Sequence, residues 1–117
     1  MKKNKTVSIT VESSFCAAHW HDKTLDEPLH AHKFNYGVTL TGKLNDEGFL
    51  VDFRSLYACL QEFNKTLENK NLNEIFRYPT TENLAIYIFE EIAKTYPQIT
   101  KVTVREREGF SATYEGQ

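Results

Sequence analysis

The chain has 117 residues, of which 40% are hydrophobic and 26% are charged, as in an ordinary soluble globular protein. Its formal net charge of −2 creates no positive field, so nucleic acid and anionic membranes are not expected partners. The basic start MKKNKT is not followed by an apolar run, and no stretch is long enough to span a membrane. We therefore expect a cytoplasmic protein with one domain over residues 1–117.

The first half of the chain predicts two strands. Residues 6–16 (TVSITVESSFC) alternate in polarity and are rich in β-branched side chains, which is typical of a strand. Residues 20–29 are polar, contain a proline and predict a loop. Residues 30–44 alternate again and predict a long second strand, which ends at the turn sequence NDEG at 45–48.

The second half predicts two helices and then two more strands. Asp52 is a suitable N-cap for the first helix. The apolar face of that helix has residues at three- and four-residue intervals: Phe53, Leu56, Leu60, Phe63 and Leu67. Residues 78–81 (YPTT) cap a second helix, whose buried face consists of Leu84, Ile88 and Ile92. Residues 101–106 and 111–116 predict strands that are joined by a turn at Gly109.

The element order ββααββ predicts an α+β fold, in which two helices cover one face of a four-stranded antiparallel sheet. The edge strands of such a sheet are unpaired, and long exposed edges favour association. Joining the sheets of several subunits into a closed β-barrel removes those edges. We therefore expect a homo-oligomer.

Three histidines suggest a metal site. His30 and His32 are separated by one residue, so in a strand both face the same side, and His19 can approach from a neighbouring strand. Three neutral imidazoles with one open position are typical of catalytic zinc, whereas structural zinc prefers paired thiolates, which this chain lacks. The spacing alone is equally compatible with ordinary strand histidines, and iron, nickel or cobalt can also occupy such a site.

Six motifs follow one another over nearly the whole chain: FCAAH at 15–19, HAHKF at 30–34, LTGKLNDEGFLVDFRSL at 40–56, LENKNLN at 67–73, PTTENLA at 79–85 and VREREGFSATYEG at 104–116. In this order and at these spacings they resemble the 6-pyruvoyl-tetrahydropterin synthase family. This family includes the bacterial 6-carboxy-tetrahydropterin synthases of queuosine biosynthesis.

The resemblance implies the tunnelling fold, in which the sheets of a homohexamer form barrels and the sites lie at subunit interfaces. It makes His19, His30 and His32 the zinc ligands. It also implies a lyase that acts on the side chain of a dihydroneopterin triphosphate-like pterin. The zinc, as a Lewis acid, makes protons near the side-chain hydroxyls easier to remove. The product is a 6-hydroxymethyl, 6-carboxy or 6-pyruvoyl pterin.

The resemblance also assigns residues to pterin binding. Glu106 is implied as the anchor of the ring, since a carboxylate can accept two hydrogen bonds from a guanidine-like N–H edge. Thr81 and Glu82 are similar to the second pterin-binding stretch. The alternatives are a helix N-terminal charge for Glu82 and an exposed strand carboxylate for Glu106.

The proton-transfer residues of the family are not matched. The family's usual cysteine base is absent before His30. We expect Cys16 to be a buried strand residue, and we expect both Cys16 and Cys59 to be reduced thiols. The family's usual Asp-His relay is replaced by Glu68 and Asn69, and an asparagine cannot shuttle protons.

Two other residues are candidates for catalysis. Glu27 stands three residues before His30, as in type III homologues that use a glutamate and form 6-hydroxymethyl-dihydropterin for folate synthesis, and the alternative is a solvated loop charge. His21 faces the same side as His19 if the strand continues. It either joins the metal, replaces the lost relay histidine, or is a surface residue.

Three functions remain open at the level of sequence. The first is a zinc lyase of dihydropterins with Glu27 as its base. The second is a family member with a different pterin or purine-like substrate or a different reaction. The third is a non-catalytic pterin-binding protein, against which the intact ligand and pterin motifs argue.

Overall fold

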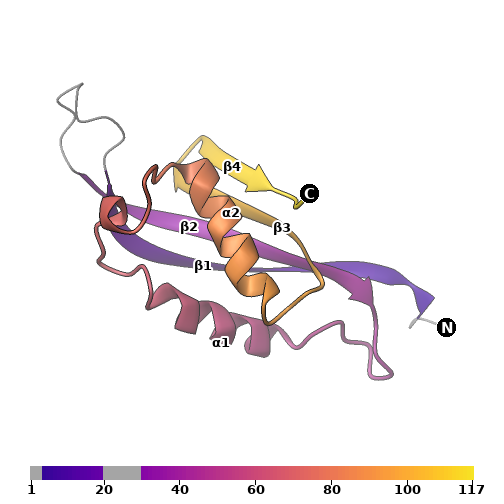
Figure 1. The fold of residues 1–117 in the computed structure, drawn as a ribbon. Coiled ribbons are helices and arrows are strands. Elements are labelled where there is room, and N and C mark those ends of the chain that lie inside the picture. The colour runs from indigo at the N-terminus through magenta and orange to yellow at the C-terminus, as the bar shows by residue number, and fades with distance from the viewer. Residues whose placement is uncertain (1–3, 20–29) are drawn as a thin grey trace.

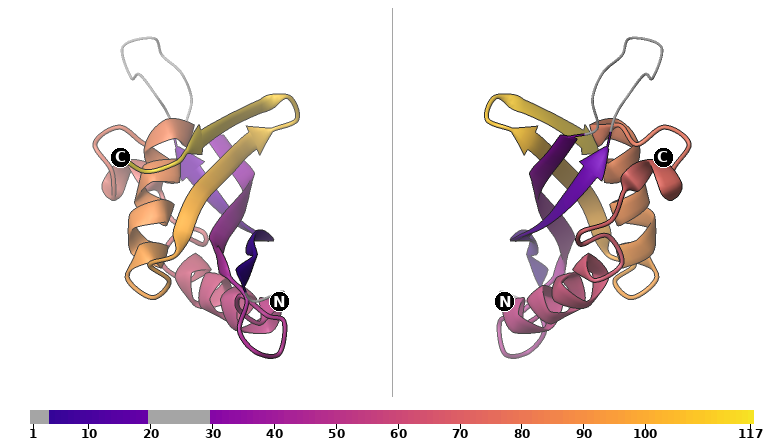
Figure 2. Two further views of the ribbon diagram at one scale, coloured as in Figure 1. Left: turned by 90° about the vertical axis from the view of Figure 1, so that its right-hand side faces the viewer. Right: turned by 90° about the vertical axis from the view of Figure 1, so that its left-hand side faces the viewer.

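The protein has two layers, a sheet and a pair of helices (Figure 1). The computed structural model describes residues 4–19 and 30–117. The sheet runs in the order β1 (Thr6–His19), β2 (His30–Lys43), β3 (Ile99–Arg107) and β4 (Phe110–Tyr114), and each neighbouring pair is antiparallel. The helices are α1 (Phe53–Asn64), the short 3-10 helix η3 (Leu72–Glu74) and α2 (Thr81–Ala93). Both α-helices cover the same face of the sheet, as Figure 2 shows, so the predicted α+β architecture is confirmed.

The two long strands pair over their whole length. β1 and β2 each contain 14 residues, and their register runs from Thr6 opposite Lys43 to His19 opposite His30. β1 thus continues past the predicted end at residue 16. Alanines carry little strand signal of their own, but Ala17 and Ala18 stay in the sheet because β2 is paired with them.

Both helices begin at the predicted caps. The side chain of Asp52 accepts a hydrogen bond from the Arg54 amide at 2.8 Å, and the Thr80 hydroxyl accepts one from the Asn83 amide at 3.1 Å. Each cap satisfies a backbone N–H that has no partner inside its helix. No helix in the two described ranges is long and apolar enough to cross a bilayer.

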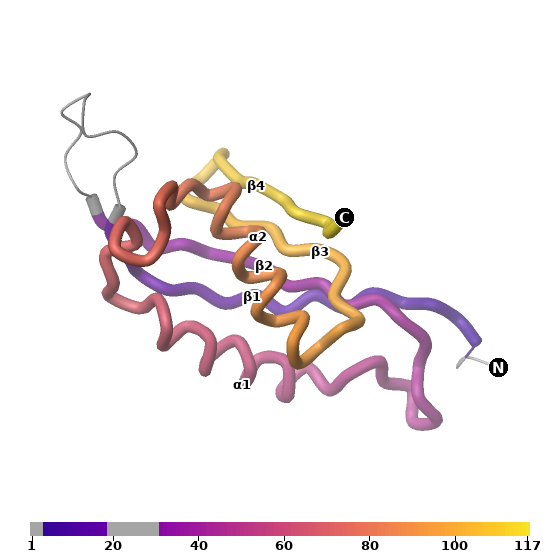
Figure 3. Tube along the Cα trace, in the orientation of Figure 1, coloured from indigo at the N-terminus to yellow at the C-terminus, as the bar shows by residue number. Residues whose placement is uncertain are grey.

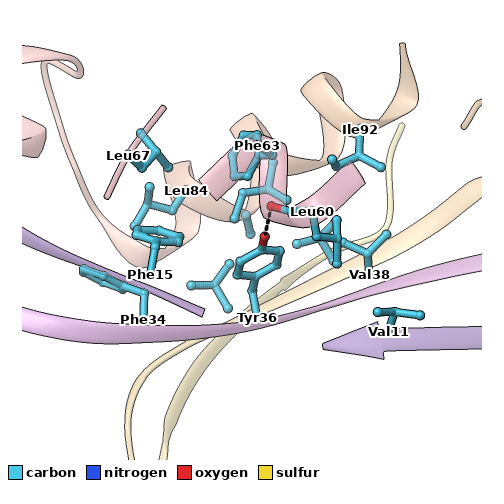
Figure 4. Packing of buried hydrophobic residues seen from close by; sticks show 14 of the residues in the cluster. Val11, Phe15, Phe34, Tyr36, Val38, Leu60, Phe63, Leu67, Leu84 and Ile92 are labelled. Atoms are coloured by element: carbon cyan, nitrogen blue, oxygen red, sulfur yellow. Dashed lines mark hydrogen bonds between the residues drawn. The ribbon is translucent and has the colours of Figure 1, made fainter. Parts of the chain in front are cut away.

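The core lies between the sheet and the helices (Figure 4). Alternate residues of β2, including Phe34, Tyr36 and Val38, are buried against the helices. The helices contribute a matching set of buried residues: Leu56, Leu60, Phe63, Leu84, Ile88 and Ile92. Leu67 is also fully buried, although it lies beyond the end of α1.

Phe53 does not belong to the buried face of α1. Phe53 is 57% exposed, and Tyr57, one turn later, is 48% exposed. Together with Val11 of β1, these rings line an open groove beside the edge of the sheet. The helical spacing predicted Phe53 on the apolar face, and this prediction is wrong because the buried face of the helix begins only at Leu56.

Candidate active site

The three predicted metal ligands occupy one face at one end of the sheet. The register pairs His19 directly with His30 and places His32 opposite Ala17. Directly opposed residues and residues two apart in a strand belong to the same face. This is the face that the helices cover, since Phe34, two residues after His32, is fully buried there. The backbone register therefore places all three positions on one face, whereas the side chains of His19 and His30 lie outside the described part of the chain.

Glu106 meets His32 at this end of the sheet. Its Oε1 lies 3.3 Å from Nε2 of His32, and both side chains are largely buried, at 18% and 23% exposure. The pairing of β3 with β4 shifts between Arg105 and Arg107, which is the irregularity of a β-bulge at Glu106. Bulges re-aim side chains next to functional sites. Glu106 also follows the buried Val102 and Val104 at alternate positions of β3, so it faces the same side of the sheet as His32.

A pocket of about 300 Å³ adjoins this contact. It is lined by Thr81 and Glu82 from the first turn of α2, by Glu106, and by the β3–β4 hairpin from Gly109 to Ala112. The volume is at the lower end of the range for small-molecule sites. All three residues predicted to bind substrate therefore lie in one pocket.

The pocket is chemically suited to a ring that carries N–H donors. Two carboxylates and the hydroxyls of Thr81 and Ser111 provide hydrogen-bond acceptors. Phe110 adds an aromatic surface that is 56% exposed, and the guanidinium of Arg107 lies 4.6 Å from the centre of that ring. Gly109 adopts a φ of 87°, which a side chain disfavours, and it closes the hairpin that carries Phe110. Sequence reasoning predicted the turn at Gly109 but not that Phe110 lines the pocket.

The residues present fit a metal ion on the histidine face. The described side chains contain no group of three or more His, Cys, Asp and Glu that could hold a metal. The side chains of His19 and His30, two of the three predicted ligands, are not among them. Three imidazoles are a donor set for zinc. A carboxylate beside one ring nitrogen, as Glu106 is beside His32, is the outer-shell arrangement of metal-binding histidines.

Cys16 is exposed, so the expectation that it is buried is wrong. It lies between Phe15 and Ala17, which are both buried, and strand alternation therefore turns it to the uncovered face of β1. Cys59 is partly buried, and this burial raises the pKa of its thiol. Both cysteines are free thiols, and neither lines the pocket beside Glu106.

Glu27 and His21 lie outside the described residues. Their roles as base, extra ligand or relay remain hypotheses.

The segment that replaces the Asp-His relay lies along the edge of β1 (Figure 3). The carboxylate of Glu68 accepts a hydrogen bond from the Cys16 amide at 3.2 Å, and the Asn69 amide donates to the Cys16 carbonyl at 2.7 Å. The Ala18 amide donates to the Lys70 carbonyl at 2.9 Å. Asn69 has a φ of 61°. Asparagine tolerates this left-handed backbone better than most residues, which was the available sequence signal for such a turn.

Comparison with known proteins agrees with this fold. The family model described as 6-pyruvoyl tetrahydropterin synthase matches residues 8–117. A dihydroneopterin monophosphate aldolase of Pyrococcus furiosus is 37% identical over 94 residues, which cover 80% of this chain and 82% of the relative. A protein of Archaeoglobus fulgidus, provisionally named 6-carboxy-5,6,7,8-tetrahydropterin synthase, is 33% identical over 86% of this chain and 88% of its own length. The structure of Caenorhabditis elegans 6-pyruvoyl tetrahydropterin synthase superposes with a TM-score of 0.85 at 26% identity, over 97% of each chain.

Proposed function

This chain belongs to the 6-pyruvoyl tetrahydropterin synthase family, and on that premise we propose that it is a zinc-dependent lyase that cleaves the side chain of a phosphorylated dihydroneopterin to give a 6-hydroxymethyl pterin. The observation that carries the proposal is the pocket of Thr81, Glu82 and Glu106, which is joined to the histidine face by the contact of Glu106 with His32. The 37% identity with an aldolase of phosphorylated dihydroneopterin supports this reaction class.

The pocket binds the pterin ring in this proposal. The carboxylates of Glu106 and Glu82 accept hydrogen bonds from the N–H groups of the ring, and the Thr81 hydroxyl adds a further polar contact. Phe110 provides a flat apolar surface for the same ring. Because the pocket and the histidine face adjoin at Glu106, one substrate can occupy both, with its ring in the pocket and its side chain toward the histidines.

Bond cleavage needs a base near the side-chain hydroxyls. Zinc held by His19, His30 and His32 would supply Lewis acidity that makes these hydroxyl protons easier to remove. Glu27 accepts the proton of the second hydroxyl, and the bond between the first and second side-chain carbons breaks. The bonding electrons pass to the first carbon, which then takes up a proton. The products are the 6-hydroxymethyl pterin and a phosphorylated two-carbon aldehyde, so atoms and electrons balance.

Glu27 needs a suitable pKa for this role. A free glutamate titrates near ~4.3, and a base that works near neutral pH benefits from a higher value. Desolvation raises a carboxyl pKa, whereas a nearby cation lowers it. Glu27→Gln is expected to abolish turnover while zinc and pterin still bind. Turnover that survives this substitution would remove Glu27 from the mechanism.

The reaction is tested by incubating the zinc-loaded protein with dihydroneopterin monophosphate and, separately, with the triphosphate. We expect a 6-hydroxymethyl pterin and an equimolar two-carbon aldehyde, both measured by liquid chromatography with mass detection. A 6-pyruvoyl product would contradict carbon–carbon cleavage. Pterin binding without any product would support a non-catalytic pterin-binding protein instead.

The second candidate is formation of a 6-carboxy pterin. It is favoured by the 33% identity with the Archaeoglobus fulgidus protein, whose provisional name states that activity. The same incubation separates the two candidates, because only this one yields a carboxylate at position 6.

His21 is a secondary proposal for the same site. If it joins the metal or relays protons, His21→Ala lowers zinc content or turnover. Unchanged values for both would make His21 a surface residue.

We also propose that the protein is a homo-oligomer, with a hexamer as the form that the family resemblance implies. β1 and β4 each have only one strand neighbour, so the described sheet has two open edges. Large aromatic side chains are exposed near one of them, on α1. The cytoplasmic location of the protein remains a prediction.

A further inference from the structure

We propose that Glu68 and Asn69 are positioning residues that fix the end of β1 that carries His19, rather than a proton relay. This inference rests on the proposed function, because it assigns His19 to the zinc site. It concerns the two positions at which the chain departs from the Asp-His pair of its family.

The segment after α1 forms a short clamp on the edge of β1. We define the clamp as Glu68–Asn71. Three hydrogen bonds attach it to Cys16 and Ala18, and Asn71 makes a parallel bridge with Ala18. Every one of these contacts falls within the last four residues of β1.

Edge strands need such partners. On one side β1 is paired with β2, and on the other side its backbone groups have no strand neighbour in the sheet. The amide of Cys16 would point to solvent without the Glu68 carboxylate, and the amide of Ala18 would do so without the Lys70 carbonyl. Unpaired ends of strands fray and open locally. The clamp therefore holds the backbone next to His19 in the register that places it opposite His30.

The geometry of each residue explains its identity. The carboxylate of Glu68 accepts a hydrogen bond from the backbone amide of Cys16, and this contact is structural. Asn69 uses its backbone, which turns at a φ of 61° and donates to Cys16. A residue at this position needs to tolerate the left-handed conformation, and proton transfer by its side chain is not required.

The clamp is anchored from the protein interior. Leu67 directly before it is fully buried, and so is Leu72 directly after it. The Glu68 amide also donates to the carbonyl of Asn64 at the end of α1, at 2.8 Å. The clamp is thus fixed to the core at both ends, and its hydrogen bonds hold the end of β1 in place.

Paired variants of the full chain test the proposal. Glu68→Gln keeps an acceptor for the Cys16 amide, whereas Glu68→Ala removes it. Asn69→Gly keeps the left-handed backbone, whereas Asn69→Val opposes it. Glu62→Ala is the control, because Glu62 is an exposed carboxylate near the end of α1 that pairs only with Lys65 among its described salt bridges.

Zinc affinity, measured by competition with a chelator, is the first readout. We expect Glu68→Ala and Asn69→Val to weaken zinc binding roughly three- to tenfold, the scale of one hydrogen bond. Glu68→Gln, Asn69→Gly and Glu62→Ala are expected to bind zinc like the natural chain. Amide exchange at Cys16 and Ala18 should be faster in the two weakened variants only.

Catalysis gives the second readout. Glu68→Gln keeps a hydrogen-bond acceptor but cannot carry a proton, so an unchanged pH profile of kcat supports the clamp and a lost acidic or basic limb overturns it. Equal zinc affinity of Glu68→Ala and Glu68→Gln also overturns the proposal. If the natural chain binds no zinc, the proposed function fails instead, and the exchange rates still report whether the clamp orders β1.

Discussion

At the scale of single residues, Glu106 connects the two halves of the site. It lines the pocket together with Thr81 and Glu82, and it lies 3.3 Å from the imidazole of His32. One carboxylate is therefore placed to serve both the proposed recognition of the ring and the orientation of a proposed metal ligand. It lies on the helix-covered face of β3 because it follows the buried Val102 and Val104 at alternate positions, next to the register shift between Arg105 and Arg107.

Replacing Glu106 by glutamine should disrupt both contacts. The amide retains one acceptor oxygen but presents N–H donors to a ring edge that also donates. We expect Glu106→Gln to lower kcat/KM for the pterin substrate by roughly 10- to 100-fold, the cost of one hydrogen bond to a charged group. Glu108→Gln, an exposed glutamate in the same hairpin, is the control and should be neutral. Equal kinetics of the two variants would place the ring elsewhere.

At the scale of elements, a chain of hydrogen bonds joins α1 to the sheet. The Tyr36 hydroxyl of β2 donates to the Asn64 side-chain oxygen at 2.6 Å, and the Asn64 amide group donates to the Ser13 hydroxyl of β1 at 2.8 Å. Ser13 donates in turn to Gln61 at 2.8 Å. Figure 4 shows Tyr36 beneath Leu60, whose carbonyl lies 3.4 Å from the same hydroxyl.

Removing the Tyr36 hydroxyl should destabilise the fold. Tyr36→Phe leaves the oxygen of Asn64, a buried residue, without its donor, and an unsatisfied buried polar group costs about 1–3 kcal/mol. Urea unfolding measures this loss. Tyr57→Phe, on the exposed side of α1, is the control and should change the free energy of unfolding by less than about 0.5 kcal/mol.

The same hydroxyl predicts a pH dependence of stability. Burial raises the pKa of Tyr36 far above its ordinary value near 10. The folded state keeps the proton while the unfolded state loses it, so this contribution is complete below pH ~10 and declines as the pH rises further. Tyr36→Phe lacks the decline. We expect the difference in unfolding free energy between the two proteins to shrink above pH ~10, by up to ~1.4 kcal/mol per pH unit. A constant difference from pH 8.5 to 11 would contradict this.

The elements could be predicted because burial follows simple periods. Alternation along β2 and the caps at Asp52 and Thr80 correspond to what the structure contains. Asn69 is a sequence signal for a turn, but the exposure of Cys16 and the attachment of that turn to β1 could not be predicted, because both depend on which strand edge and which sheet face other segments cover. For the same reason the sequence could suggest Glu106 and Glu82 separately but could not show that one pocket contains both.

At the scale of the whole molecule, the open edges of the sheet predict association. Phe53 and Tyr57 line an apolar groove beside edge strand β1, which is a suitable surface for a second copy of the chain. We expect a solution mass several times 13.6 kDa by light scattering. Phe53→Glu should reduce this mass, whereas Lys65→Glu, exposed at the other end of α1, should not. A monomeric natural chain would refute the oligomer.

The pairing of His19 with His30 has a consequence for how new activities can arise on this fold. The described ladder of β1 and β2 reaches that pair, so the spacing of the two histidines along the sheet is set by the strands. We therefore predict that residues 20–29, which include the proposed base Glu27, can be exchanged as one segment while the proposed metal-binding positions of β1 and β2 stay in register. Transplanting the corresponding segment from a relative with another reaction outcome is expected to change the proposed base, and with it the product, without changes to the strands.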